Sequence, residues 1–504
     1  MILERRIRRR TGRVGRPDRR HATRPFGRAV RVATIAVACG LATAAAIAIS
    51  ACRETSTGTA SADEPANVLL ITLDTTRADR LGCYGYDGGT SPNIDALAAD
   101  AVRFERATAT AAVTPVSHAS ILTGLYPHHH SLRVFYGPIG HSLPEDQPTL
   151  ATMLAARGWQ TGAFISAYPA SERFGLDQGF EFFETGIAAA VMQRYPRKRL
   201  QREVVKWARQ RTAMAQRRAD ATTDDALAWL EQAQRPFFAW VHYFDPHDAS
   251  LIPPEEITDR FAFSRRAPKP KSAIYDPEIF FMDANVGRLL ERLKATGEYD
   301  DSIIVIVSDH GQGLGDHGWQ QHRLLYQEQI RTPLIIRTPN GPRGRVVSAV
   351  ASGVDIAPTI LAAAGVAIPD GIDGRDLLAA LDDDDGGGRI VLAEALNSLD
   401  ALTPRRLPAH QKDLLFCAMD ARWKLIYHHD HPENSELYDL ASDPRELTNV
   451  IARYPEEKQR LLRRLSESGA MVIDTVAPDA PEAEESIRML ESLGYIHGDT
   501  ETPN

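Results

Sequence analysis

Two stretches of the sequence place acidic and imidazole side chains directly after short apolar runs. Asp309 and His310 follow Ile303–Val307, and Asp74 follows Asn67–Leu73. Each run is rich in aliphatic residues, which is typical of a strand buried on both faces of a parallel sheet. Open α/β sheets place their functional sites at the carboxyl ends of such strands. Carboxylate and imidazole side chains in such a place are candidate ligands of a divalent metal ion.

The neighbours Asp309 and His310 reach one ion only if the chain turns after the strand, because adjacent strand residues point to opposite faces. Gly311, Gly313 and Gly315 follow and permit such a turn. The alternative reading of the Asp-His-Gly triplet is a polar strand end with a surface histidine. The triplet alone does not decide between the two.

A third segment lies between the two strands and completes a resemblance. It is Thr114–Gly124, with the sequence TPVSHASILTG. The three segments, in this order, resemble the sulfatase family of the alkaline phosphatase superfamily, and the likeness continues to Leu493-Gly494-Tyr495 near the C-terminus. It implies an α/β fold: an alkaline-phosphatase-like sandwich with a large mixed, mostly parallel central sheet flanked by helices, plus a small C-terminal α+β subdomain.

The resemblance also implies an activity and a role for each matching residue. The activity is metal-dependent hydrolysis of sulfuric (or phosphoric) esters, as in arylsulfatases. Thr114 occupies the nucleophile position, His118 stands where the family has an arginine, and Arg77 would orient the site. His247 matches a donor to substrate oxygens, and His322 matches a residue that assists the leaving group. The implied metal ligands are Asp74, Thr114, Asp309 and His310.

Thr114 is a departure from the family pattern. Typical sulfatases carry Cys or Ser there, oxidised to formylglycine, whose hydrated aldehyde attacks the ester. Threonine has a secondary alcohol, so its oxidation would give a ketone. We therefore expect no formylglycine, and we expect the threonine hydroxyl to attack directly and form a covalent ester that water hydrolyses. This shifts the expected chemistry toward phosphorus.

The metal site departs from the family as well. Thr75 stands where many sulfatases have another metal-binding aspartate, and with His310 this makes the site less like an all-oxygen calcium cage. Calcium, manganese and zinc all remain candidates. Asp245, His247 and His322 are an alternative set for a second metal ion. Phe135 stands near a position where relatives often place an asparagine.

Residues 1–52 have the features of an export and anchoring segment. An arginine-rich start precedes Val32–Ala51, which carries no charge, and Cys52 follows. This resembles a bacterial lipoprotein signal with Cys52 as the lipidated residue. The alternative is a single transmembrane helix, since about 20 apolar residues just span a bilayer. Both readings predict an enzyme that is held at a membrane outside the cytoplasm, in the cell envelope, for example in the periplasm. Its expected partners are an ester substrate and the membrane, and no nucleic acid is expected.

Composition fits a large globular protein: the chain has 504 residues, 43% hydrophobic and 25% charged, with a net charge of −8. Cys83 and Cys417 are expected to be isolated.

The apolar spacing predicts several helices: Ile94–Phe104, one starting at Thr114, Asp276–Leu293 and a last one starting at Asp443. The basic stretch Arg194–Arg218 is interpreted as a solvated helix face. We expect an anchor at 1–52, a linker at 53–66, a catalytic domain at 67–380, a C-terminal subdomain at 389–497 and a tail at 498–504.

Two further readings remain open. The first is a phosphodiester or phosphonate hydrolase, or a phosphoryl transferase, of the same superfamily. The second is a degenerate sulfatase fold that serves as a binding lipoprotein without activity. Joint retention of the metal ligands, the nucleophile, His247 and His322 argues against the second. The segments Ile187–Arg218 and Leu396–Asp413 carry no motif that names a substrate.

Overall fold

The computed structural model of the chain describes residues 65–137, 139–186, 216–247, 251–261, 272–382, 388–404 and 406–473. The chain divides into two compact units, Met1–Ala62 and Asp63–Asn504, and all described residues belong to the second. The predicted anchor with Cys52, most of the linker, most of the basic stretch Arg194–Arg218 and the C-terminal tail lie outside the described residues.

The main sheet has eight strands in the order β4-β3-β5-β1-β6-β7-β2-β8. Along the chain these are β1 Asn67–Leu73, β2 Val102–Thr108, β3 Gln160–Ile165, β4 Phe182–Glu184, β5 Phe237–Tyr243, β6 Ser302–Val307, β7 Arg331–Arg337 and β8 Arg345–Ser352. Strand β7 runs antiparallel to both of its neighbours, and the other pairings are parallel. The sheet is therefore mixed and mostly parallel, as predicted.

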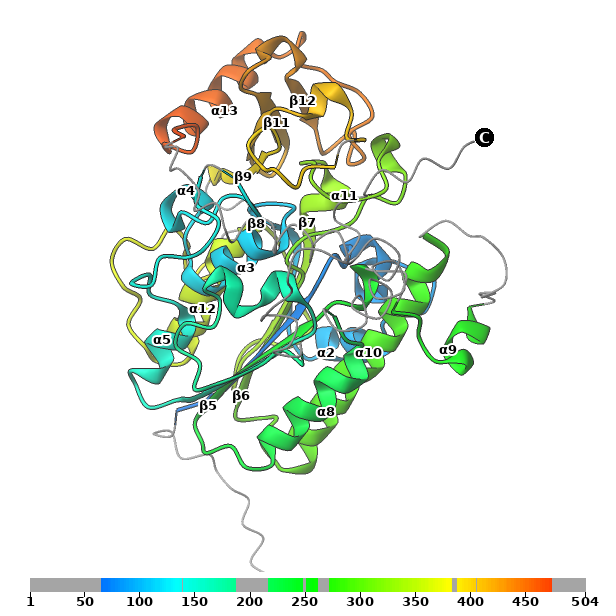
Figure 1. Ribbon diagram of the computed structural model, residues 1–504, viewed down its shortest axis with the longest axis vertical. Coiled ribbons are helices and arrows are strands. Elements are labelled where there is room, and N and C mark those ends of the chain that lie inside the picture. The colour runs from blue at the N-terminus through cyan, green and yellow to red at the C-terminus, as the bar shows by residue number, and fades with distance from the viewer. Residues whose placement is uncertain are drawn as a thin grey trace, which may run out of the picture. The chain divides into compact units, whose positions relative to one another are not determined.

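Alternation along the central strand β1 divides the core into two layers. Val68 and Leu70 face one cluster, while Leu69, Ile71 and Leu73 face the other. The first layer contains α3 Thr114–Thr123, α5 Leu150–Ala155 and α12 Ile356–Ala363, and the second contains α2 Pro92–Ala99, α8 Ala219–Leu230 and α10 Ser272–Ala295. Figure 1 shows these two helical layers on opposite sides of the sheet. Burying both faces of β1 explains its unbroken apolar sequence.

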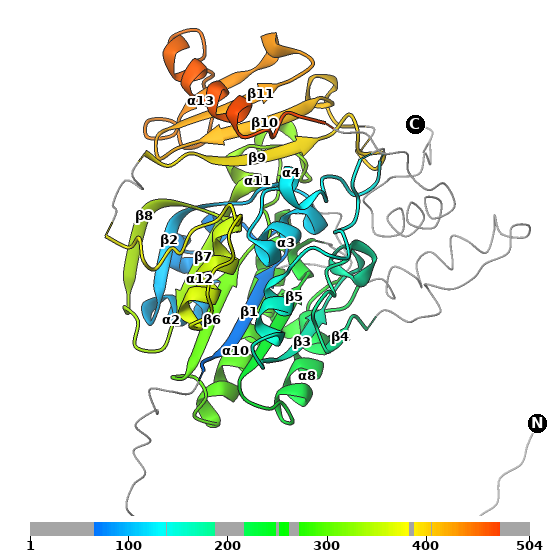
Figure 2. The ribbon, with the colours of Figure 1, turned by 90° about the vertical axis from the view of Figure 1, so that its left-hand side faces the viewer.

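A second, antiparallel sheet follows in the C-terminal region, in the order β12-β11-β10-β9. Figure 2 shows β9, β10 and β11 of this sheet side by side. Its strands are β9 Val391–Leu396, β10 Leu414–Met419, β11 Trp423–His428 and β12 Glu436–Asp439, and α13 Pro455–Glu467 packs on it. The shorter helices are α4 Pro127–His130, α9 Glu255–Arg260 and α11 Gln327–Ile330. This confirms the small C-terminal α+β region, whereas the predicted domain boundaries stay predictions.

Two predicted helices are wrong in extent. The helix expected over Ile94–Phe104 ends at Ala99, because the chain turns at Asp100 and enters β2 at Val102. The apolar residues Val102 and Phe104 fit a helical spacing, but they face the core from a strand. The last described helix begins at Pro455 and not at Asp443. Cys83 and Cys417 are free thiols, as expected.

No helix within the described ranges is both long enough and apolar enough to cross a bilayer.

A buried ion pair joins the second sheet to the segment that leads into β7. Lys424 Nζ on β11 lies 2.6 Å from Glu446 Oε1, and both side chains are fully buried. Glu446 Oε2 in turn accepts a hydrogen bond from the backbone N–H of Gln327, the first residue of α11, at 2.5 Å. Removing one partner of such a pair leaves an uncompensated buried charge.

We therefore expect Lys424→Met to lower the free energy of unfolding by about 3–5 kcal/mol, measured by urea denaturation. The double variant Lys424→Met with Glu446→Gln should recover part of that loss, because no charge is then left unpaired. Lys294→Met, at an exposed position on α10, is the control. Unfolding of Lys424→Met at the wild-type urea concentration would contradict this account.

Candidate active site

Parallel pairing of β1 with β6 brings the predicted acidic residues together. Thr72 on β1 lies opposite Val307 on β6, so Asp74 and Asp309 leave the sheet at the same edge. Asp74, Asp309 and His310 each offer a ligand atom within 4.8 Å of the others, and all three are buried. The chain turns after β6 as predicted, so neighbouring residues point into one site.

Close packing explains the glycine that follows this pair. A Cβ on Gly311 would lie 2.2 Å from the carbonyl oxygen of Glu328, so the backbone passes too close for any side chain. The Gly311 N–H donates to the carbonyl of Gln329 at 2.8 Å, which fixes the turn. The turn that aims both ligands therefore depends on a glycine here.

The carboxylate of Asp309 is only half satisfied by hydrogen bonds. Oδ1 accepts from the backbone N–H groups of Thr75 at 3.1 Å and His310 at 2.7 Å. Within the described ranges, Oδ2 accepts no hydrogen bond. Burial raises the pKa of Asp309 well above its usual range, and the nearby charge of Asp74 raises it further. Two buried carboxylates this close together suit a divalent cation.

The orientation of His310 completes the set of donors. Its Nδ1 donates to the carbonyl of Gly311 at 2.9 Å, which leaves the lone pair on Nε2. That Nε2 atom lies 3.3 Å from Asp309 Oδ2 and 3.3 Å from Thr114 Oγ1. A lone pair directed at a carboxylate is repulsive unless a cation or proton lies between them. The residues present therefore fit a metal ion.

Thr114 lies at the first position of helix α3. Val113 is extended, Pro115 favours the start of the helix, and Gly124 ends it with a φ of 74°. The partial positive charge of a helix N-terminus favours an anion, so it also favours a deprotonated hydroxyl or an ester oxygen at this place. The structure brings Thr114 to the cluster of Asp74, Asp309 and His310, as the resemblance implied.

His118 lies one turn further along α3 and is fully buried. Its Nδ1 donates to the carbonyl of Thr114 at 2.8 Å, and its Nε2 accepts from the Thr72 hydroxyl at 3.1 Å. Burial lowers the pKa of His118 well below its usual range, and the neighbouring His242 lowers it further. The residue in the family's arginine position is thus a neutral ring that braces the start of α3, and its catalytic role stays a prediction.

His247 and His322 face each other beside the cluster. Their Nε2 atoms are 3.2 Å apart, and His322 Nδ1 donates to the carbonyl of Ala112 at 2.8 Å. The His322 ring lies 4.6 Å from that of His310 between centroids. Because the His322 proton is on Nδ1, its Nε2 atom accepts a hydrogen bond from the Nε2–H of His247. This hydrogen bond lies close to the predicted metal ligands.

Asp245 and Arg77 are directed elsewhere. Asp245 Oδ1 accepts from the backbone N–H of Ala219 at the start of α8, and burial raises the Asp245 pKa to about 7. Among the described residues, Asp74, Asp309 and His310 form the one group with metal-binding geometry, so the alternative set with Asp245 is not assembled.

The guanidinium of Arg77 binds Asp79 and Asp316, each at 2.7 Å, and so braces the loop after His310.

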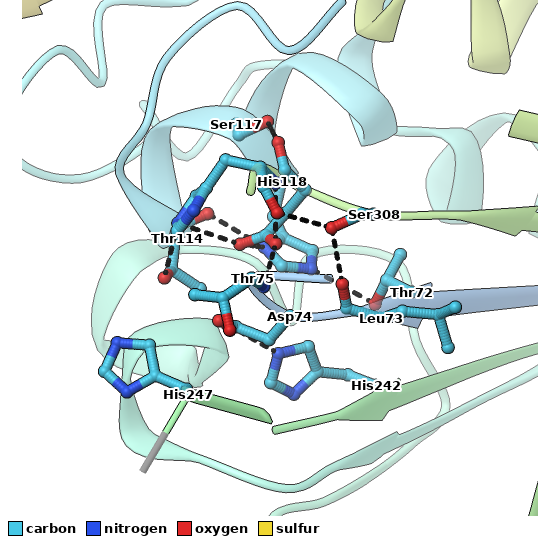
Figure 3. Close-up of polar contacts among 12 residues, drawn as sticks. Thr72, Leu73, Asp74, Thr75, Thr114, Ser117, His118, His242, His247 and Ser308 are labelled. Carbon is cyan, nitrogen blue, oxygen red and sulfur yellow. Dashed lines mark hydrogen bonds and ion pairs between the residues drawn. The ribbon is translucent and has the colours of Figure 1, made fainter. Parts of the chain in front are cut away.

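Sequence reasoning missed two features of the site, at His242 and Thr75, and Figure 3 labels both residues. His242 on β5 is fully buried, and its Nε2 lies 3.3 Å from Asp74 Oδ2. Thr75 has a φ of 52°, which is a strained conformation for a β-branched residue, and the hydroxyl of Tyr275 holds its carbonyl at 2.6 Å. The available signal for His242 was a polar residue inside an apolar strand.

Comparison with known families agrees with this geometry. The family model described as Sulfatase matches residues 66–366, more than half of the chain. A second model, described as the C-terminal region of N-sulphoglucosamine sulphohydrolase, matches residues 315–470. The two matches cover the main sheet and the second sheet respectively, with an overlap around β7 and β8.

Individual relatives span most of the chain. The N-acetylglucosamine-6-O-sulfatase of Bacteroides thetaiotaomicron is 25% identical over 82% of this chain and 88% of that protein. An arylsulfatase of Clostridium perfringens is 24% identical over 78% of this chain and 92% of that protein.

Solved structures share the fold. The phosphonate monoester hydrolase of Agrobacterium radiobacter has a TM-score of 0.62 at 24% identity, covering 80% of this chain and 95% of that one. A protein solved with its substrate D-glucosamine-2-N,6-O-disulfate also has a TM-score of 0.62, at 22% identity, covering 81% and 98% of the two chains. The Sulfatase model spans Asp74, Thr114, Asp309 and His310, so the chain belongs to the sulfatase family, and its sulfatase relatives indicate a sulfuric ester hydrolase.

Proposed function

We propose that Thr114 is the nucleophile of this sulfatase-family hydrolase and that it acts with a divalent metal ion. One observation carries the proposal: Thr114 Oγ1 lies at the start of α3, 3.3 Å from His310 Nε2, beside the two buried carboxylates. A hydroxyl so placed is close to the site of positive charge that would activate it. Threonine cannot become a formylglycine, so its own oxygen is the attacking atom.

Asp74, Asp309 and His310 would hold the ion. When bound, a divalent ion lowers the pKa of a neighbouring hydroxyl and offsets the negative charge of the ester oxygens. Calcium prefers an all-oxygen environment, whereas an imidazole beside carboxylates suits manganese or zinc. We therefore propose manganese or zinc ahead of calcium.

The residues of the chain divide the reaction into two steps. Thr114 Oγ releases its proton to solvent and attacks sulfur or phosphorus, which forms the Oγ–S or Oγ–P bond and breaks the bond to the bridging oxygen. The departing oxygen takes a proton from the His247–His322 pair, which acts as the acid when it carries one proton more than the neutral pair. Water then attacks the covalent threonine ester and returns a proton to the histidine pair, the bond to Thr114 Oγ breaks, sulfate or phosphate leaves, and Thr114 regains a proton from solvent.

The substrate class proposed first is a sulfated sugar. Support comes from the Bacteroides thetaiotaomicron relative, an N-acetylglucosamine-6-O-sulfatase, and from the fold neighbour solved with D-glucosamine-2-N,6-O-disulfate. Thr114 itself favours a second candidate, a phosphodiester or phosphonate ester. A threonine ester lacks the hemiacetal oxygen through which formylglycine enzymes expel sulfate, so it must be cleaved by water. Phosphorus esters suit that route, and the fold also serves phosphonate monoester hydrolases.

We also propose that the enzyme is held at a membrane outside the cytoplasm. The support is the sequence of residues 1–52, in which an arginine-rich start and an apolar run precede Cys52. Thioether-linked acyl chains on this cysteine would anchor the catalytic region through the segment 53–66.

Thr114→Ala is expected to lower kcat/KM by about 10⁴-fold or more on whichever ester is hydrolysed, because no other oxygen replaces the nucleophile. The assay uses aryl sulfate, a sulfated glucosamine, a phosphodiester and a phosphonate ester, each with manganese, zinc or calcium and with a chelator. Thr114→Ser is the matched control, since it keeps a hydroxyl, and it should retain measurable turnover. Wild-type turnover by Thr114→Ala would rule out the assignment.

Cys52→Ala is expected to move the full-length protein from the membrane fraction to the soluble fraction of a bacterial host, because it removes the site of acylation. Immunoblotting of fractions washed at high salt measures the distribution. A variant that stays in the membrane would instead indicate an uncleaved transmembrane helix.

A further inference from the structure

His242 is a polar residue in the middle of an apolar layer. It lies near the end of β5, where it is in register with Thr72 on β1 and Ile165 on β3. Its ring has no solvent exposure and packs near those of His118 and Trp240, with centroids 5.0 and 6.4 Å away. A buried imidazole is costly unless its nitrogens are hydrogen-bonded, so its contacts indicate what it does.

The contacts of His242 assign its proton. Nε2 lies 3.3 Å from Asp74 Oδ2, and a carboxylate can only accept a hydrogen bond. Nδ1 faces the backbone N–H of Ser166 at 3.3 Å, and that N–H, which also reaches the His242 carbonyl at 3.2 Å, can only donate. Both neighbours therefore place the single proton of the ring on Nε2. A protonated Nε2 has no lone pair for a metal ion, so His242 is outside the set of ligands.

We propose that His242 is a positioning residue that fixes the Asp74 carboxylate for metal binding through its Nε2–H. The inference deepens the proposed function and rests on it in one respect, the assignment of Asp74 as a ligand. The hydrogen bond restricts rotation of the carboxylate, one of whose oxygens lies within 4.8 Å of the ligand atoms of Asp309 and His310. Removing such a partner of a metal ligand typically weakens metal affinity about 10–100-fold.

His242 also supports the nucleophile indirectly. Its ring contacts His118 edge to face, and His118 holds the carbonyl of Thr114. Trp240 Nε1 donates to the Thr72 hydroxyl at 2.9 Å, and this hydroxyl donates to His118 Nε2. The two buried rings thus brace the metal ligand from β1 and the nucleophile from α3. Loss of ring volume and loss of the Nε2 donor must therefore be separated in any test.

The test compares His242→Gln with His242→Asn and His242→Phe in the full chain. Glutamine can place its amide nitrogen near the position of Nε2, asparagine can place it only near Nδ1, and phenylalanine keeps a ring without a donor. Calorimetric titration of chelator-treated protein with Mn²⁺ gives the affinity without any substrate. We expect wild-type affinity within about threefold for the glutamine variant, and affinity about 10–100-fold weaker for the other two.

Activity at increasing Mn²⁺ supplies a second readout. The phenylalanine and asparagine variants should need more Mn²⁺ for half-maximal activity. The phenylalanine variant should recover most of kcat at saturation, because it keeps a ring against His118, whereas the asparagine variant should recover less. His130→Asn is the matched control: His130 is also fully buried but bonds Ser120 and lies outside the cluster. It should lower thermal stability and leave Mn²⁺ affinity unchanged.

Two outcomes overturn the proposal: Mn²⁺ affinity at the wild-type level in the asparagine and phenylalanine variants, or a glutamine variant as weak as the phenylalanine variant. If the phenylalanine variant fails to fold by circular dichroism, the two amide variants decide. Wild-type protein that binds no Mn²⁺, Zn²⁺ or Ca²⁺ also overturns it, because Asp74 is then not a ligand. Wild-type protein that binds metal but hydrolyses no ester contradicts the proposed function alone.

Discussion

Charge repulsion between two buried carboxylates, Asp74 and Asp309, is the constraint on which the site depends. Unit charges about 4 Å apart repel by about 4 kcal/mol at an effective dielectric constant of about 20. The fold keeps both groups out of water, and the pKa of Asp309 is raised accordingly. A divalent ion relieves that repulsion and the repulsion of the His310 lone pair in one step. The burial of two carboxylates side by side therefore favours a bound divalent cation.

The surroundings of the carboxylates are rigid and mostly neutral. His118 and His242 are buried rings whose pKa values burial lowers, to about 3 for His242. Because neither carries a charge, neither competes with a cation for Asp74 or Asp309. They act through hydrogen bonds that fix one ligand and the first turn of α3. The neutral ring of His118 in place of an arginine leaves positive charge at the site to the metal ion and to the helix N-terminus.

The sequence predicted the sheet, the turn after β6 and the meeting of Asp74, Asp309, His310 and Thr114, because each follows from local pattern and the resemblance. Features set by long-range packing were harder to foresee. The helix Pro92–Ala99 ends before β2, because the residues from Val102 onward pair with the main sheet. The spacing of Val102 and Phe104 alone would have continued the helix. The contact of His242 with Asp74 could not be predicted, because only the pairing of β5 with β1 brings the two residues together. The binding partners of Arg77 were equally hidden, because Asp316 is distant in the sequence.

The central claim, direct attack by Thr114, is tested most directly by mass spectrometry of the active-site peptide. The resting enzyme and an acid-quenched reaction are digested, and the peptide containing Thr114 is fragmented. The account predicts an unmodified threonine at rest and, during turnover, a sulfuryl or phosphoryl group esterified to the Thr114 oxygen. An oxidised residue at position 114 at rest, or a covalent adduct on any other residue, would contradict the account.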